Sequence, residues 1–203
     1  MHETSLSLLD RLRTSPENEG WNRLANLYAP LIRVWLRRYD VQDNDAQDLT
    51  QEVLLSVSRD LRSFDHPGSP GAFRGWLKAI MINRLRKFWR SRDRNPQAHG
   101  DSDIDARLAQ LDDPTSELSH IWNREHDQYV LRQLLALAEP HFEPTTWQAF
   151  CRVALEGAKA DAVAREMGIS KNAVIVAKCR VLNKLRQEAG GLVDSSSHFF
   201  PKS

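Results

Sequence analysis

The stretch Asp161-Ala-Val-Ala-Arg-Glu-Met-Gly-Ile-Ser170-Lys-Asn-Ala-Val-Ile-Val-Ala-Lys178 decides the fold of the C-terminal part of this chain. Gly168 can take the positive φ that ends a first short helix, and Ser170 is a good N-cap for a second. The residues that would lock the two helices together are Val163, Ala164, Met167, Ile169, Val174 and Ala177. The pattern is typical of a helix-turn-helix, whose second helix enters the major groove of DNA. The alternative is an ordinary helical hairpin capped by glycine.

The rest of the chain is predicted to be helical as well. It has no sustained alternation of β-branched residues and no Asn-Gly or Asp-Gly hairpin turn. Apolar residues at helical spacing instead predict helices over residues 5–13, 19–38, 45–61, 72–92, 118–138 and 144–155. At 203 residues the chain has room for two small domains. We therefore expect an all-α fold of two small helical domains.

The composition changes between the two expected domains. Residues 95–116 contain proline, glycine and many aspartates, with little periodicity, and we interpret them as a flexible acidic linker. This interpretation gives a first domain over 1–94, a linker over 95–116, a second domain over 117–190 and a tail over 191–203.

Several classes of protein are excluded by what the sequence lacks. Cys151 and Cys179 lie far apart without His or Cys partners at metal spacing, so we expect no metal site. No apolar stretch reaches the ~18 residues that span a bilayer, and Met1 to Arg13 do not resemble a signal peptide. The seven His are scattered, and no phosphate loop or nucleophile elbow is present. We expect a soluble, cytoplasmic protein that is not an enzyme, binds no cofactor and does not contact membranes.

Charge is distributed unevenly although the net charge is only +1. Residues 74–94 hold eight Lys or Arg against one Asp, and residues 101–127 hold eight Asp or Glu against two Arg. A basic block followed by an acidic block indicates two surfaces with different partners. The acidic block could also screen the basic one if the two domains close on each other.

The helix expected over residues 72–92 mixes aromatic and basic residues. Trp76, Leu77, Ile80, Met81, Leu85 and Phe88 can form a buried stripe, with most of the cations off it. Cations bind phosphate, and aromatics beside them can stack on unpaired bases. Asn83 can bind a base edge, and the Pro/Gly-rich loop at 64–71 could hold an extruded base. The alternative is a solvated basic face over a core of aromatics.

The preceding helix carries an acidic face. It is expected to begin near Asp45, with Asp43 or Asn44 as its N-cap, and Asp45, Asp48 and Glu52 share one side. Acids in a first helical turn are favoured by the helix dipole, which leaves Gln51 and Glu52 unexplained. A solvated face and a partner surface are equally compatible with this pattern.

Three blocks in this order resemble the extracytoplasmic-function (ECF) sigma factors of the bacterial sigma-70 family. Asp45-Ala-Gln-Asp-Leu-Thr-Gln-Glu-Val53 resembles their polymerase-binding helix, and Gly71-Ala-Phe-Arg-Gly-Trp-Leu-Lys-Ala-Ile-Met-Ile-Asn-Arg84 resembles their promoter-melting segment. The helix-turn-helix resembles the domain that reads the −35 element. The resemblance implies a protein that binds the clamp helices of the largest subunit of core RNA polymerase, recognises promoter DNA and helps to open the −10 region. The resemblance also allows an anti-sigma factor as a further partner. A helix-turn-helix regulator that never engages polymerase is the alternative.

The resemblance also implies roles for individual residues. The residues implied to bind core polymerase are Asp45, Asp48, Gln51 and Glu52. Those implied to bind −10 DNA are Arg74, Trp76, Lys78, Asn83, Arg84 and Lys87, with loop residues 65–72 beside them. Those implied to bind −35 DNA are Ser170, Lys171, Asn172, Ile175, Val176, Lys178 and Arg180.

The second helix of the helix-turn-helix departs from the family. Members often have Lys, Ser and Arg where this chain has Ile175, Val176 and Ala177. Ile175 and Val176 could contact thymine methyl groups, or could pack on the domain and read nothing. Lys178 and Arg180 are expected to contact phosphates.

Overall fold

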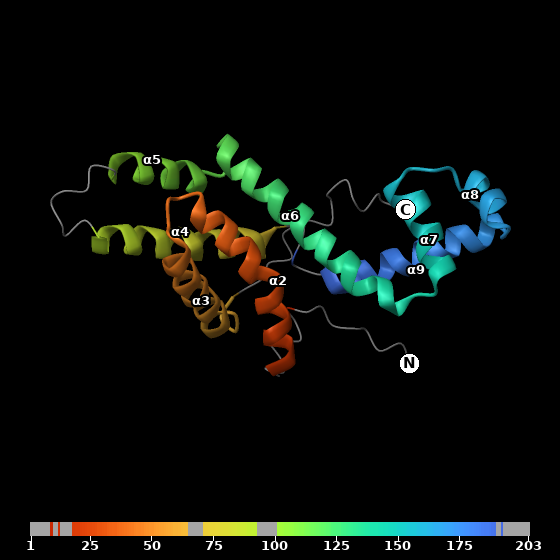
Figure 1. Ribbon diagram of the computed structural model, residues 1–203, viewed down its shortest axis with the longest axis horizontal. Coiled ribbons are helices and arrows are strands. Elements are labelled where there is room, and N and C mark those ends of the chain that lie inside the picture. Colours follow the sequence, from red (N-terminus) through yellow and green to blue (C-terminus); the bar gives the residue numbers. More distant parts are fainter. Residues whose placement is uncertain are drawn as a thin grey trace.

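The computed structural model describes residues 9, 12, 18–64, 71–92, 101–189 and 192. Within these residues the fold is all-helical, as the sequence predicts (Figure 1). The helices are α2 (Asn18–Arg37), α3 (Asp43–Asp60), α4 (Ala72–Arg92), α5 (Asp101–Asp112), α6 (Glu117–Ala138), the 3₁₀ turn η1 (Glu139–His141), α7 (Pro144–Phe150), the π-helical turn η2 (Cys151–Leu155), α8 (Ala160–Met167) and α9 (Lys171–Ala189). Of the helix expected over 5–13, only Leu9 and Leu12 lie among the described residues, and both are buried.

Helices α2, α3 and α4 pack around a core of aromatic and aliphatic side chains. Tyr28, Ile32 and Trp35 are buried because they follow one another at helical spacing along one face of α2. Helix α4 has the predicted bounds. Helix α3 begins earlier than expected, so the predicted cap at Asp43 or Asn44 is wrong: Gln42 is the N-cap residue. Asp43 instead forms an ion pair with Arg37 at 2.6 Å.

The segment interpreted as a flexible acidic linker contains helix α5, which is a correction to that interpretation. Ile104, Leu108 and Leu111 are buried, and their spacing of four and three residues places them on one face. The helix lies along α4 (Figure 1), where Asp112 accepts a hydrogen bond from Arg86 at 3.0 Å. Asp103 and Asp105 are exposed, and the many aspartates of the segment obscured the apolar period in the sequence. The expected start of the linker, 95–100, lies outside the described residues.

Helix α6 links the two ends of the molecule (Figure 1). Ser116 caps it by accepting a hydrogen bond from the Ser119 N–H at 3.0 Å. Trp122 in its first half meets Trp35 of α2 edge-on, with ring centroids 4.8 Å apart, and the helix also packs on α9. One connected apolar cluster therefore runs from α2 through α6 to α9. The domain limits drawn from the sequence stay a prediction.

The predicted helix-turn-helix is confirmed in α8 and α9. Gly168 has the left-handed φ of 66° that ends α8, and Ser170 accepts a hydrogen bond from the Ala173 N–H at 3.1 Å. A separate small cluster joins the two helices to α7 through Ala149, Val163, Ala164, Val174 and Ala177. The short apolar residues of this cluster allow α8 and α9 to pack closely.

Candidate polymerase and nucleic-acid interfaces

The acidic face of α3 lies at the surface. Asp48, Gln51 and Glu52 are exposed, whereas Asp45 is half-buried and pairs with Arg92 of α4 at 2.5 Å. Three of the four residues implied to bind polymerase are thus presented together to solvent. The fourth holds α3 to the end of α4.

Sequence reasoning missed Leu55 on this face. It follows Gln51 and Glu52 by one helical turn and is 69% exposed, the most exposed large apolar side chain among the described residues. The signal was present, since Leu55 falls outside the apolar stripe that α3 turns toward the core. Leu55 therefore gives the acidic face an apolar side chain beside its carboxylates, which is the composition of a binding surface with an apolar centre and a polar rim.

An open groove of about 420 Å³ separates α3 from α4 on the same side of the molecule. Asn83 and Lys87 are exposed at it, and Arg59 and Arg90 add positive charge. The complete lining is Ser56, Arg59, Asp60, Ile80, Asn83, Arg84, Lys87 and Arg90. The groove therefore combines an amide and several cations with one aliphatic side chain, Ile80. Its cations suit the phosphates of a nucleotide strand.

Arg84 of the −10 set is engaged inside the protein. Its guanidinium donates to the Ser56 hydroxyl at 2.6 Å and pairs with Glu52 at 3.4 Å. Arg84 therefore ties α4 to α3 and connects the groove to the acidic face.

Arg74 and Lys78 of the same set are held by α6. The Arg74 guanidinium donates to the Asp127 carboxylate, and Lys78 donates to the Ser119 hydroxyl at 2.6 Å. Lys78 is only 8% exposed, and burial lowers the pKa of its amine. In this arrangement neither cation is available to DNA.

Trp76 is half-buried and stacks on Phe64, with ring centroids 4.6 Å apart. The stack stands where the Pro/Gly-rich loop leaves α3 and returns to α4. Residues 65–70 of that loop, expected to hold an extruded base, lie outside the described residues. Gly71, which is described, has a φ of 75° and starts the turn into α4.

A buried polar chain joins α2, α6 and α4, and the sequence had given no sign of it. The Tyr28 hydroxyl donates to His126 Nε2 at 3.3 Å, and His126 Nδ1–H donates to Asp127 at 2.9 Å. Burial lowers the pKa of His126, and the Asp127 carboxylate offsets this only in part. Burial would raise the pKa of Asp127, but hydrogen bonds from His126 and Arg74 bring it below its usual value. In this series of hydrogen bonds, a neutral imidazole therefore lies between a phenol and an ionised carboxylate.

Helix α9 presents the residues implied to bind −35 DNA. Ile175 and Val176 are 43% and 44% exposed, so they do not pack on the domain. Lys171 pairs with Asp161 at 3.0 Å on the surface, while the Ser170 hydroxyl serves as the cap. Asn172 is exposed and Lys178 is half-buried.

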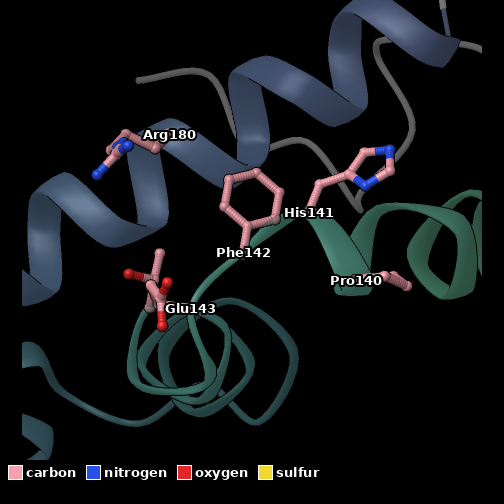
Figure 2. Close-up of a pocket in the computed structure, with 6 residues that line it drawn as sticks. Pro140, His141, Phe142, Glu143 and Arg180 are labelled. Carbon is pink, nitrogen blue, oxygen red and sulfur yellow. The ribbon is translucent and has the colours of Figure 1, made fainter.

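Arg180 lies at a cleft between α9 and the turn that joins α6 to α7. Figure 2 shows it on α9 above Phe142 and Glu143 of the turn. The cleft has a volume of about 310 Å³ and is lined by Pro140, His141, Phe142, Glu143, Thr146 and Arg180. Arg180 is exposed there and can reach a phosphate at the edge of α9.

The remaining expectations concern metals, thiols and membranes. Cys179 is exposed on α9 and Cys151 is half-buried, where burial raises the pKa of its thiol. Across the described ranges, no group of three or more His, Cys, Asp or Glu side chains is placed to hold a metal ion. None of the helices described is both long and apolar enough to cross a membrane.

Comparison with known proteins gives a family match within the N-terminal half of the chain. Residues 24–95 match the family described as sigma-70 region 2. The chain is also similar to the ECF RNA polymerase sigma factor SigE of Mycolicibacterium smegmatis (strain ATCC 700084 / mc(2)155), with 29% identity over 91 residues. That alignment covers 45% of this chain and 34% of the relative, so the chain spans about a third of the length of the curated relative that it matches. The family match contains α3, α4 and the groove between them.

Proposed function

We propose that this chain, whose residues 24–95 match sigma-70 region 2, acts as an ECF-type sigma factor that binds core RNA polymerase and directs it to promoters. The observation that carries the proposal is the acidic face of α3, which lies inside the matched segment and is open to solvent. Its partner would be the clamp helices of the largest polymerase subunit. The chain would work in the bacterial cytoplasm, where polymerase meets promoter DNA, without a catalytic step of its own. An anti-sigma factor would be a competing partner for the same face.

The proposed polymerase interface is centred on Leu55. Protein interfaces commonly combine an apolar centre with a polar rim, and here Asp48, Gln51 and Glu52 form such a rim. Glu52 already pairs with Arg84, so Asp48 is the acid that can meet a partner without breaking a contact within the chain. We expect Asp48 and Leu55 to contribute most to binding.

The proposed −10 site is the groove between α3 and α4. Asn83 would read the edge of an unpaired base, and Lys87 would contact the strand's phosphates. Trp76, stacked on Phe64, and Arg84, bonded to Ser56, would act by holding α4 in position beside the strand. Arg74 and Lys78 would act on DNA only through the position of α4, since their side chains hold α6.

The proposed −35 site is α9, docked in a major groove. Lys171, Lys178 and Arg180 would neutralise phosphates, which makes the binding depend on salt concentration. Ser170 would act by capping the helix, and Asn172 lies in the first exposed turn that faces the bases.

The test is binding of the full-length chain to cognate core polymerase. Asp48→Lys should weaken binding about 30-fold or more, which corresponds to ~2 kcal/mol, because the new positive charge would repel the cation that Asp48 is proposed to meet on the partner. Asp105→Lys is the matched control, since it reverses another exposed acid on α5 and should leave binding unchanged. Unchanged binding by Asp48→Lys would contradict the assignment of this face. An unmodified chain that binds promoter duplex but never core polymerase would instead be a helix-turn-helix regulator.

A further inference from the structure

One exposed face of α9 carries two aliphatic side chains next to an amide and a thiol. Asn172, Ile175, Val176 and Cys179 are all exposed and are spaced at i, i+3, i+4 and i+7. At 3.6 residues per turn these positions fall on one side of the helix. We call these four residues the reading face.

The reading face is not a misplaced part of the core. Val174, Ala177 and Val181 on the other side of α9 are 0%, 6% and 0% exposed, so the packing of the helix-turn-helix is complete without Ile175 and Val176. The left-handed Gly168 and the Ser170 cap fix where α9 starts. The helix therefore cannot rotate to bury the reading face without breaking both contacts.

Cations flank the reading face on both sides. With 100° per residue, Lys171 and Lys178 fall on one side of Ile175, and Arg180 falls beyond Val176 on the other. The ion pair of Lys171 with Asp161 is exposed and therefore weak enough to be exchanged for a phosphate. Two aliphatic side chains with cations on both sides are complementary to a major groove, whose base edges lie between two phosphate backbones.

The aliphatic side chains of the reading face limit which base edges it can recognise. The apolar group that a major groove offers is the C5-methyl of thymine, whereas the other base edges present hydrogen-bond donors and acceptors. An aliphatic side chain that covers such a polar edge leaves it without water or a partner, at a cost in free energy. Ile175 and Val176 are also β-branched and stiff, so little side-chain freedom is lost when they are ordered.

We propose that the reading face recognises thymine methyl groups, so that the −35 element of this protein carries thymines opposite Ile175 and Val176. The inference rests on the proposed function and adds which bases the −35 site prefers. Asn172 would supply the hydrogen-bonding readout at the same face, and the flanking cations would supply affinity without sequence preference.

The experiment uses the complex of the full-length chain with core polymerase and a pool of duplexes randomised at the −35 position. Selection should enrich thymines at adjacent positions. Replacing each of them by deoxyuridine removes only the methyl group and keeps the hydrogen-bonding edge. Each replacement should weaken binding about fourfold, which is the effect of exposing one buried methyl group.

Two variants connect the methyl effect to α9. Ile175→Ser and Val176→Ser change exposed side chains and remove the methyl groups from them. Both variants should therefore fold normally by circular dichroism, and each should lose the preference for thymine over deoxyuridine at one position. Arg180→Gln is the control: it should weaken binding to the thymine and deoxyuridine duplexes equally. Equal affinity for the two duplexes, or a selected element without thymine, would overturn the inference and leave the sigma-factor proposal standing. Failure of the chain to form the polymerase complex would overturn the proposed function first.

Discussion

Replacing Asp127 by alanine should destabilise the protein strongly, because this carboxylate holds α6 against α4 and α2. It accepts hydrogen bonds from Arg74 and from His126, and the Arg74 and Asp127 side chains are only 12% and 13% exposed. Removing one partner of a buried ion pair costs ~3–5 kcal/mol, and an unsatisfied N–H on His126 adds ~1 kcal/mol or more. Partial exposure places the expected loss near 3 kcal/mol, out of the ~5–15 kcal/mol typical of a folded protein.

The measurement is urea unfolding followed by tryptophan fluorescence, since Trp35 and Trp122 meet across the same α2–α6 interface. With a dependence of ~2–3 kcal/mol per molar urea, the midpoint should fall by about 1–1.5 M. Asp105→Ala on the exposed face of α5 is the control and should shift the free energy of unfolding by less than ~0.5 kcal/mol.

A double variant separates the ion pair from simple loss of packing. Arg74→Met with Asp127→Leu replaces both charges by apolar groups of similar size, so it should recover most of the stability lost by Asp127→Ala. An Asp127→Ala protein as stable as the control would refute the reasoning, because α6 would then not be seated on α4 in solution.

Two further predictions concern protonation and backbone conformation. Since the folded pKa of His126 lies below its unfolded value near 6.5, the unfolded chain binds more protons below that pH, and the free energy of unfolding should fall as pH drops from about 6.5 toward the folded pKa. Urea titrations at several pH values should show this slope, and His126→Gln should lack it; an equal slope in both proteins would place the titration elsewhere. Gly168→Ala should cost ~1–2 kcal/mol, because its φ of 66° disfavours any side chain although nothing lies within 4 Å of the added Cβ. Gly75→Ala within α4 also adds a Cβ to open space, but at a residue without a positive φ, and it should stabilise the protein by ~0.5–1 kcal/mol. Because the two variants differ in backbone conformation and not in crowding, thermal unfolding of the pair isolates the cost of the positive φ. Destabilisation in both variants would contradict this account.

Local interactions explain why the helices and the helix-turn-helix could be predicted. Helical hydrogen bonds, caps and apolar periodicity act between residues three or four apart, so α4 and α6 were readable from the chain alone. Gly168 and Ser170 mark the turn between α8 and α9 for the same reason. Helix α5 was missed because the five aspartates and two prolines of residues 95–116 outweighed the three apolar residues that pack it on α4.

By itself, the sequence determined the all-helical class, the helix-turn-helix and the exposed acidic face of α3, since each depends on neighbours along one helix. Only the tertiary structure decided which cations are free. Lys87 stays exposed at the groove, whereas Arg74 and Lys78 are taken by Asp127 and Ser119, 53 and 41 residues away. It also decided that α9 turns Ile175 outward. Such contacts depend on how α6 and α9 pack against the rest of the molecule, and that packing follows from burial of apolar surface contributed by the whole chain.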